Sequence, residues 1–404
     1  MHGPCRSPGL LGCASASGEG TAGNLKLVSS RRRFVASFAA ASAWAAYPSA
    51  YQRAAAAEGT PRGRSLPSVA VRYLDPATEF VVVRLTDPQY SALLPSGGAR
   101  VLSSRAMLYA SDASGKWEAL RMDLHTHESR QLTDATALDP RSLSFQSGER
   151  GFWHFDTGRL IETNIGNGKT REVYRTADEF EKTPGVSYSD DGRSAALVEK
   201  GGAGYRLRLL DLVRGTARTL VETAGVEAPE EIREPLLRPK HGSVLYGIGT
   251  ATWLVDLTGG NSRRLALAEG DLLQCQWAAD GHALVYLNRP PDPGKLVALR
   301  EFTPETGNDV WLANTSQFAR FSANADASVF TGASGSKASP YVLLLARAVK
   351  REFTLAEHRA SDPRMVAPVF TPNSQAVLFQ SDRHGKPAIY WMAVEKFVAE
   401  TEGS

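Results

Sequence analysis

The sequence contains few cysteines, and all but one lie close to its start. The three are Cys5, Cys13 and Cys275, so the body of the chain has a single thiol and cannot form an internal disulfide. A domain of this length buries enough apolar surface to be stable without disulfides. We expect Cys275 to be a buried small apolar side chain, with a reactive or metal-binding thiol as the alternative.

Net charge is also low. The formal net charge of +3 arises in residues 1–50, which hold five cations against one anion, so the remaining chain carries about −1. Nucleic-acid binding depends on clustered cations that neutralise phosphates. A near-neutral body therefore excludes nucleic acid as the expected partner.

Several catalytic signatures are missing as well. The sequence has no Gly-x-Ser-x-Gly elbow, no glycine-rich phosphate loop and no paired-cysteine motif. Serine hydrolases, nucleotide-dependent enzymes and zinc–cysteine sites are therefore unsupported. No segment shows a helical period of useful length, which favours an all-β chain.

The sequence does contain an export-like segment near its start. Positions 30–35 read Ser-Arg-Arg-Arg-Phe-Val and precede an alanine-rich run at 36–46, an order typical of a twin-arginine signal peptide. That run is too short and too weakly apolar to span a membrane. We predict a signal in residues 1–57, a linker at 58–78, and a periplasmic or secreted protein with no membrane span after signal removal. A basic arm, amphipathic or disordered, and a lipobox-like site at Cys13 are the alternatives.

A long internal repeat indicates the architecture. Residues 108–116, Leu-Tyr-Ala-Ser-Asp-Ala-Ser-Gly-Lys, return at 378–386 as Leu-Phe-Gln-Ser-Asp-Arg-His-Gly-Lys, an offset of 270 residues. Six four-stranded propeller blades of about 45 residues have this length. The repeat therefore predicts seven blades, with the two copies in the first and the last.

Shorter signals between the two copies mark the individual blades. Aromatic or apolar residues recur nine positions apart around turn residues such as Asp191-Gly192 and Asp280-Gly281, which suit hairpins. Blades are expected to begin near residues 88, 137, 183, 230, 271, 316 and 362. We predict a seven-bladed β-propeller of four-stranded blades over residues 79–396, followed by a tail at 397–404. A six- or eight-bladed ring is the alternative, because residues 151–162 are irregular.

The two ends of the propeller are expected to meet. The chain ends after a third strand, 388–396, in the last blade, whereas a spare strand at 79–85 precedes the first blade. Pairing these two strands would close the ring and remove two exposed sheet edges.

Several motifs along the repeat resemble one family. Leu85-Thr86-Asp87 opens the body, Ser-Asp-x-x-Gly-Lys turns recur, Arg238-Pro239 follows an apolar pair, and Phe370-Thr371-Pro372 precedes Gln380-Ser381-Asp382-Arg383. Over roughly residues 75–396 these features resemble the oligogalacturonate lyases. The Phe-x-Pro and Ser-Asp pieces are shared with TolB-type, WD40-like propellers.

The resemblance implies a fold and a chemistry. Oligogalacturonate lyases are seven-bladed propellers that cleave short galacturonate oligomers by β-elimination, with a manganese ion in the central funnel. The reaction removes a proton next to a carboxylate, so it needs a general base and a cation near that carboxylate. In the family, histidines and a glutamine bind the metal and a further histidine acts as the base.

Alignment with the family places other residues at these positions. The resemblance puts histidines where this chain has Glu234, Gln274 and Ala367, and a histidine and a glutamine where it has Met365 and Asp362. Manganese is expected from the family, yet the ligand histidines are absent, so we predict that the metal site is largely lost. Two oxygen ligands, from Gln274 and Asp362, would make only a weak cation site.

The same alignment nominates residues for an altered site. Glu234 is the candidate general base beside Arg238, and these two form the predicted catalytic pair. Gln274, Asp362 and His358 are expected to line the funnel. The alternative for Glu234 is a solvated carboxylate paired with a neighbouring arginine.

Two functions remain open from the sequence. One is an exported, lyase-like protein that cleaves or recognises uronate oligosaccharides. The other is a non-catalytic, TolB-like propeller that binds a periplasmic protein or a glycan. A catalytic site should gather the five candidate residues at one funnel mouth, whereas a binding module should show a broad apolar patch.

Overall fold

The computed structural model describes residues 62–95, 100–223 and 230–395. Every described residue belongs to one compact unit, Glu58–Ser404. The predicted signal peptide and C-terminal tail lie outside the described residues. No helix in the described ranges is long and apolar enough to cross a membrane.

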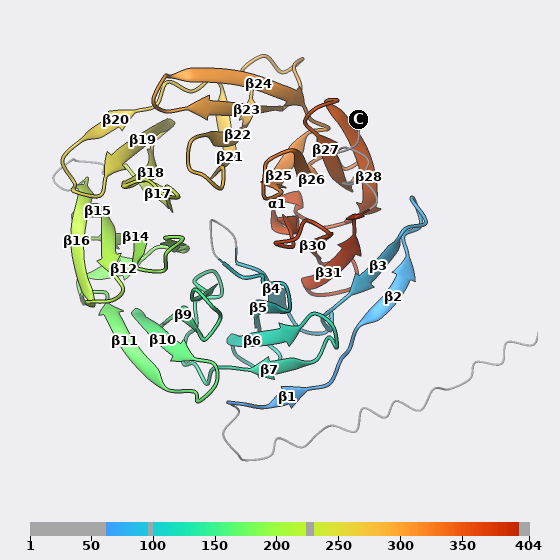
Figure 1. Ribbon diagram of the computed structural model, residues 1–404, viewed down its shortest axis with the longest axis horizontal. Helices are drawn as coiled ribbons and strands as arrows, with labels where there is room; N and C mark the ends of the chain where they lie inside the picture. Colours follow the sequence, from blue (N-terminus) through green and yellow to red (C-terminus); the bar gives the residue numbers. More distant parts are fainter. Residues whose placement is uncertain (1–61, 96–99, 224–229, 396–404) are drawn as a thin grey trace, which may run out of the picture. The chain divides into compact units, whose positions relative to one another are not determined.

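Antiparallel sheets follow one another around a ring (Figure 1). The described chain forms seven sheets, of which four have four strands and three have five. Strands adjacent in sequence pair within each sheet, which is the arrangement of a propeller blade. The predicted all-β, seven-bladed propeller is confirmed.

The bounds of the strands follow the chain from blade to blade. The first blade contains β4 (Ala92–Leu93), β5 (Ala106–Ser111), β6 (Glu118–Asp123) and β7 (Ser129–Gln131), and the second β8 (Ser144–Phe145), β9 (Gly151–Asp156), β10 (Arg159–Asn164) and β11 (Thr170–Arg175). The third contains β12 (Phe180–Lys182), β13 (Ser187–Tyr188), β14 (Ser194–Gly201), β15 (Gly204–Asp211) and β16 (Thr216–Glu222). The fourth contains β17 (Ile232–Leu237), β18 (Ser243–Ile248), β19 (Ala251–Asp256) and β20 (Ser262–Arg264).

The remaining blades complete the described chain. The fifth contains β21 (Asp271–Trp277), β22 (Leu284–Arg289), β23 (Ala298–Thr303) and β24 (Asn308–Asn314), and the sixth β25 (Phe318–Ala323), β26 (Val329–Ser334), β27 (Tyr341–Ala346) and β28 (Arg351–Glu357). A short helix, α1 (Pro363–Val366), leads into the seventh, with β29 (Val369–Phe370), β30 (Ala376–Ser381) and β31 (Ala388–Ala393).

Strands from the start of the described chain join the first and last sheets. Strand β1 (Ser65–Leu66) pairs with β7 of the first blade, whereas β2 (Val71–Leu74) pairs with β3 (Val81–Arg84). Strand β3 in turn pairs with β31, with Val83 opposite Trp391. The spare strand, β3, is therefore paired with the third strand of the last blade, which is the contact that the expected ring closure requires. Strands β1 and β2 fall within residues 58–78, the segment that the sequence assigned to a linker.

The core lies between neighbouring blades. Val329 and Leu344 of the sixth blade share a buried cluster with Phe379 and Tyr390 of the seventh, and the last two rings stack with centroids 5.2 Å apart. Because side chains alternate between the two faces of a strand, each blade packs against both of its neighbours. Truncating a fully buried ring such as Phe330 to alanine would cost about 3–5 kcal/mol of folding free energy.

The predicted hairpin turns are present. Gly192 and Gly281 have φ of 68° and 74°, values in the left-handed region where glycine carries no steric penalty. Gly281 is constrained a second time, because a Cβ atom there would lie 2.0 Å from the carbonyl oxygen of Pro239. The turn after β21 therefore packs directly against the turn after β17.

Candidate functional site

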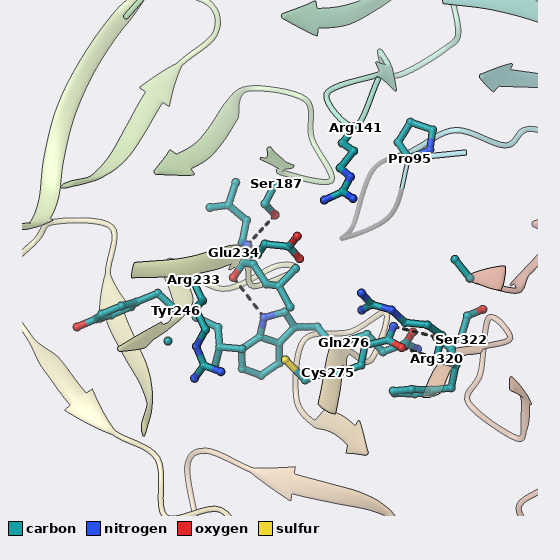
Figure 2. Close-up of a pocket in the computed structure, with 18 of the residues that line it drawn as sticks. Pro95, Arg141, Ser187, Arg233, Glu234, Tyr246, Cys275, Gln276, Arg320 and Ser322 are labelled. Atoms are coloured by element: carbon teal, nitrogen blue, oxygen red, sulfur yellow. Dashed lines mark hydrogen bonds between the residues drawn. The ribbon is translucent and has the colours of Figure 1, made fainter. Parts of the chain in front are cut away.

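A cavity of about 820 Å³ lies among the innermost strands of the ring. Its lining residues come from β17, β21, β25 and β29 and from loops that precede β8 and β13. A concave space of this size accommodates a small-molecule ligand. The residues that line it therefore define the candidate site (Figure 2).

Three of the innermost strands are irregular where they border this cavity. The register of strand pairing shifts at residues 233–236 in β17, 272–274 in β21 and 318–320 in β25. A β-bulge changes the direction of side chains and often lies beside a functional site. Glu234 and Arg320 lie at two of these irregularities, which gives a local cause for a charged side chain on an inner strand.

Two arginines and one glutamate project into the same open space. Figure 2 shows Arg141 from the loop before β8, Glu234 from β17 and Arg320 from β25 directed toward it. Among the described residues, none of these three charged groups has an ion-pair or hydrogen-bond partner. Arg233 also lines the cavity, but its guanidinium lies against Gly247, where an added Cβ atom would be 2.7 Å from Nε.

Arg141 is positioned by a turn with a buried ion pair. Asp139 Oδ1 accepts a hydrogen bond from the Arg141 amide at 2.9 Å, and Asp139 Oδ2 binds Lys182 Nζ at 2.5 Å. The Lys182 side chain is 6% exposed and lies 4.9 Å from the centroid of the Phe155 ring. Burial lowers the pKa of Lys182, an effect that the Asp139 carboxylate opposes. Because a buried ammonium requires a partner, this pair stabilises the turn that carries Arg141.

Gln274 lines the cavity, as predicted, but its side-chain amide is occupied. Its Nε2 donates to the carbonyl of Phe321 at 3.0 Å, and its Oε1 accepts from the amide of Phe321 at 2.8 Å. This two-point contact joins β21 to β25. It also fixes the main chain immediately beyond Arg320.

Arg238 lies outside the lining of the cavity. Its side chain is 4% exposed, with Nη2 2.7 Å from Glu305 and Nε donating to the carbonyl of Gly281 at 2.6 Å. The guanidinium also lies 4.9 Å from the centroid of the Trp277 ring. Arg238 therefore joins the turns of two neighbouring blades, and the structure does not place it beside Glu234 as a catalytic partner.

His358 and Asp362 also lie apart from the cavity lining. His358 is buried and uses both ring nitrogens, because Nδ1 accepts from the Ala360 amide and Nε2 lies 3.0 Å from the carbonyl of Ser334. Asp362 is the N-cap of α1 and forms an ion pair with Arg364 at 2.9 Å. Hydrogen bonds from Arg364 lower the pKa of Asp362. Both side chains thus have structural partners.

The cavity therefore brings together only part of the predicted set. Glu234 and Gln274 line it, whereas Arg238, Asp362 and His358 do not. The sequence reasoning missed Arg141 and Arg320. A charged residue directly before the aromatic position of an inner strand was a usable signal for Arg320, whereas Arg141 lies in a turn with no distinguishing pattern.

The residues at the family's metal positions do not fit a manganese ion. The Gln274 oxygen is engaged by Phe321, Ala367 has no donor atom, and Asp362 is paired with Arg364. The Glu234 carboxylate remains as a possible oxygen ligand, and a single carboxylate is too few ligands for a manganese ion. Within the part of the chain that the structure describes, no group of three or more histidine, cysteine, aspartate or glutamate side chains could hold a metal ion. The two guanidinium groups in the cavity would also repel a divalent cation.

Cys275 lines the cavity without reactive character. Burial raises the pKa of its thiol to about 12, so the thiolate that nucleophilic attack or metal binding requires is not populated at neutral pH. The side chain packs against an apolar cluster. The sequence predicted a buried small apolar side chain, and in the structure Cys275 is apolar in its contacts but only partly buried.

Comparison with known proteins extends these observations. The chain is 23% identical over 389 residues to the oligogalacturonide lyase of Pectobacterium atrosepticum, and 22% identical over 398 residues to the oligogalacturonate lyase of Dickeya dadantii. Each alignment covers 81% of this chain and 97% of the relative. No family model matches the chain.

Solved structures show the same fold. An oligogalacturonate lyase in complex with manganese superposes with a TM-score of 0.76 at 21% identity, covering 84% of this chain and 99% of that one. The oligogalacturonate lyase of Vibrio parahaemolyticus gives a TM-score of 0.75 at 21% identity, covering 82% and 98%. The chain resembles the oligogalacturonate lyases in sequence over 81% of its length. It also resembles them in fold.

Proposed function

We propose that this propeller binds short uronate oligosaccharides in the cavity that contains Arg141, Glu234 and Arg320. The observation that carries the proposal is the pair of guanidinium groups that face the cavity with no partner among the described residues. A guanidinium in a concave site is suited to bind a carboxylate through two parallel hydrogen bonds. The resemblance to proteins named for oligogalacturonate supports this ligand class.

Calorimetric titration tests the binding. The purified chain beginning at Glu58 should give saturable heat with trigalacturonate and none with maltotriose, a neutral trisaccharide of the same length. Arg141→Gln should weaken trigalacturonate binding by about tenfold, since it removes a charge-assisted contact. Arg214→Gln is the matched control, because the Arg214 side chain is 80% exposed in an outer turn. Equal heats with both sugars would reject the proposal.

A second candidate function, β-elimination, is favoured by the position of Glu234. Its carboxylate has no partner among the described residues and faces the same space as the two arginines. In this reaction Glu234 would take the proton next to the uronate carboxylate, and the C–H electrons would form the new double bond. The bond to the leaving oxygen would break, and that oxygen would take a proton from water in the open cavity. The hydroxide left behind would take the proton from Glu234, which restores the carboxylate.

Ultraviolet absorbance of the unsaturated uronate product measures this step. The wild-type chain should release that product from trigalacturonate, and Glu234→Gln should abolish release while binding persists. Release that persists in Glu234→Gln would exclude Glu234 as the base. Binding without any release from the wild-type chain would identify a recognition protein, in place of a lyase.

Export through a twin-arginine signal in residues 1–57 forms the last part of the proposal. It rests on the Arg31-Arg32 pair before the alanine-rich run. Cell fractionation should find the full chain in the periplasm or the medium. The double variant Arg31→Lys with Arg32→Lys should remain in the cytoplasm, and unchanged export of that variant would contradict this assignment.

A further inference from the structure

The environment of Arg320 bears on how a carboxylate is neutralised in this cavity. Arg320 lies on β25, which packs against β21 on one side and against α1 and β29 on the other. These neighbouring segments carry Gln274, Asp362 and Ala367, the positions that the family resemblance assigns to metal ligands. A permanent cation therefore lies among the positions expected to hold a metal.

The backbone around Arg320 is held firmly. Both main-chain polar groups of the next residue, Phe321, bind the Gln274 amide at 2.8 and 3.0 Å. The Phe321 ring is 2% exposed and contacts Phe330, with centroids 6.3 Å apart. The register shift at 318–320 sets the direction in which Arg320 leaves the strand. A residue at the family's ligand position thus serves here to fix the arginine.

The charge distribution of the cavity agrees with such a role. Across the cavity, Arg141 and Glu234 project toward the same space as Arg320 (Figure 2). An arginine keeps its charge at any physiological pH and offers a planar fork of donors that matches a carboxylate. Asp362, the N-cap of α1, interacts electrostatically with Arg320 but forms its ion pair with Arg364. Arg320 itself forms no ion pair with a described carboxylate, so its guanidinium is available to a ligand.

We propose that the Arg320 guanidinium takes the place of the metal ion, binding the uronate carboxylate directly, so that ligand binding by this propeller needs no divalent cation. This inference rests on the proposed function. It makes Gln274 a positioning residue for Arg320 in place of a metal ligand. The Arg320 side chain, through its contact with the carboxylate, would then select acidic sugars over neutral ones.

Calorimetric titration with trigalacturonate in excess chelator tests the proposal directly. The wild-type chain should bind with the same affinity in chelator as with added manganese. Arg320→Gln should weaken binding by about 10- to 100-fold, because it removes a charged two-point contact. Arg320→Lys, which keeps the charge and loses the fork, should show an intermediate loss. Arg214→Gln should bind as the wild type does.

The outcomes separate this inference from the proposed function. Binding that occurs only with manganese would overturn the role of Arg320 and leave uronate binding intact. Binding unchanged in Arg320→Gln would also overturn it. No binding of trigalacturonate under either condition would overturn both proposals. Thermal unfolding of each variant within a few degrees of the wild type shows that the comparison concerns folded protein.

Discussion

At the scale of single residues, the charged groups divide into those that hold the fold and those that face the cavity. Arg238 and Glu234 are four positions apart in the sequence, yet Arg238 is buried against Gly281 and Glu305 while Glu234 is exposed. Glu234 lies within β17, whereas Arg238 directly follows the end of that strand. Arg238 is therefore expected to contribute to stability and Glu234 to ligand chemistry.

Arg238→Met tests this division. Removing the guanidinium leaves the buried carbonyl of Gly281 without its donor, which should lower the free energy of unfolding by about 1–3 kcal/mol. Urea denaturation followed by circular dichroism measures the change. Trigalacturonate affinity of the folded variant should stay within about twofold of the wild type. A variant of normal stability that has lost ligand affinity would restore Arg238 to the site.

His154 gives a pH-dependent prediction at the same scale. It is 3% exposed on β9, stacks on Phe152, and its Nδ1 has no hydrogen-bond partner in the structure. Burial lowers its pKa from 6.5 to about 4. Between pH 6.5 and 4 the histidine is protonated in the unfolded chain and neutral in the folded chain. The free energy of unfolding therefore decreases as the pH falls through this range, and His154 accounts for about 3 kcal/mol of the decrease.

His154→Phe removes the titrating group while keeping an aromatic ring. Unfolding free energies of the wild type and the variant should differ by a nearly constant amount above pH 6.5. Below that pH the wild type should lose stability faster, by up to about 3 kcal/mol at pH 4. If the two plots of unfolding free energy against pH ran parallel over this range, His154 would not titrate as described.

How far the sequence predicted the site depends on what each residue contacts. Glu234 and Gln274 line the cavity, and the sequence located both by counting along the blade repeat to the innermost strands. His358 was not, because whether a histidine faces a cavity or binds Ser334 depends on tertiary contacts. Arg141 was missed because a turn without a distinguishing pattern directs its side chain, and Arg320 was missed because its one signal, a charge directly before an inner-strand aromatic residue, does not show which way a bulged strand turns the side chain.

At the scale of elements, strand pairing across the two ends of the described chain is the notable feature. Strand β3 pairs with β31, and Val82 on β3 is fully buried in a cluster with Phe379 and Tyr390. The sequence predicted this pairing from a missing outer strand. It did not predict β1 and β2, because both are short and lie in the segment that was assigned to a linker.

Truncation tests the contribution of these strands. A chain beginning at Thr86 lacks β1, β2 and β3, so it should expose the edge of β31, melt at a lower temperature and aggregate on heating. A chain beginning at Glu58 is the control and should behave as the full-length protein. Equal melting temperatures by calorimetry would show that β3 adds nothing to the stability of the ring.

At the scale of the whole molecule, the blade count was the most secure prediction. The 270-residue offset between two matching segments fixes six repeats between them, and the structure has seven sheets. Blade starts were predicted near 230, 271 and 316, and β17, β21 and β25 begin at Ile232, Asp271 and Phe318. Repeats predict the scaffold well because each blade must bury both faces against its neighbours.

The scaffold positions residues without specifying their chemistry. Of the inner strands that the family resemblance connects with manganese, β17 here presents Glu234, and Gln274 on β21 bonds to the backbone of β25, the neighbouring strand that presents Arg320. A lyase-like propeller here carries a cavity whose cations are guanidinium groups. We propose that Arg320 binds a uronate carboxylate in this cavity without a metal.

A crystal structure of the chain soaked with digalacturonate in the presence of chelator tests this claim most directly. The account predicts electron density for the sugar in the cavity, with a carboxylate within hydrogen-bond distance of both terminal nitrogens of Arg320 and Glu234 on the opposite side. A sugar bound elsewhere, or one that enters the cavity only when a metal ion lies between its carboxylate and the protein, would contradict it.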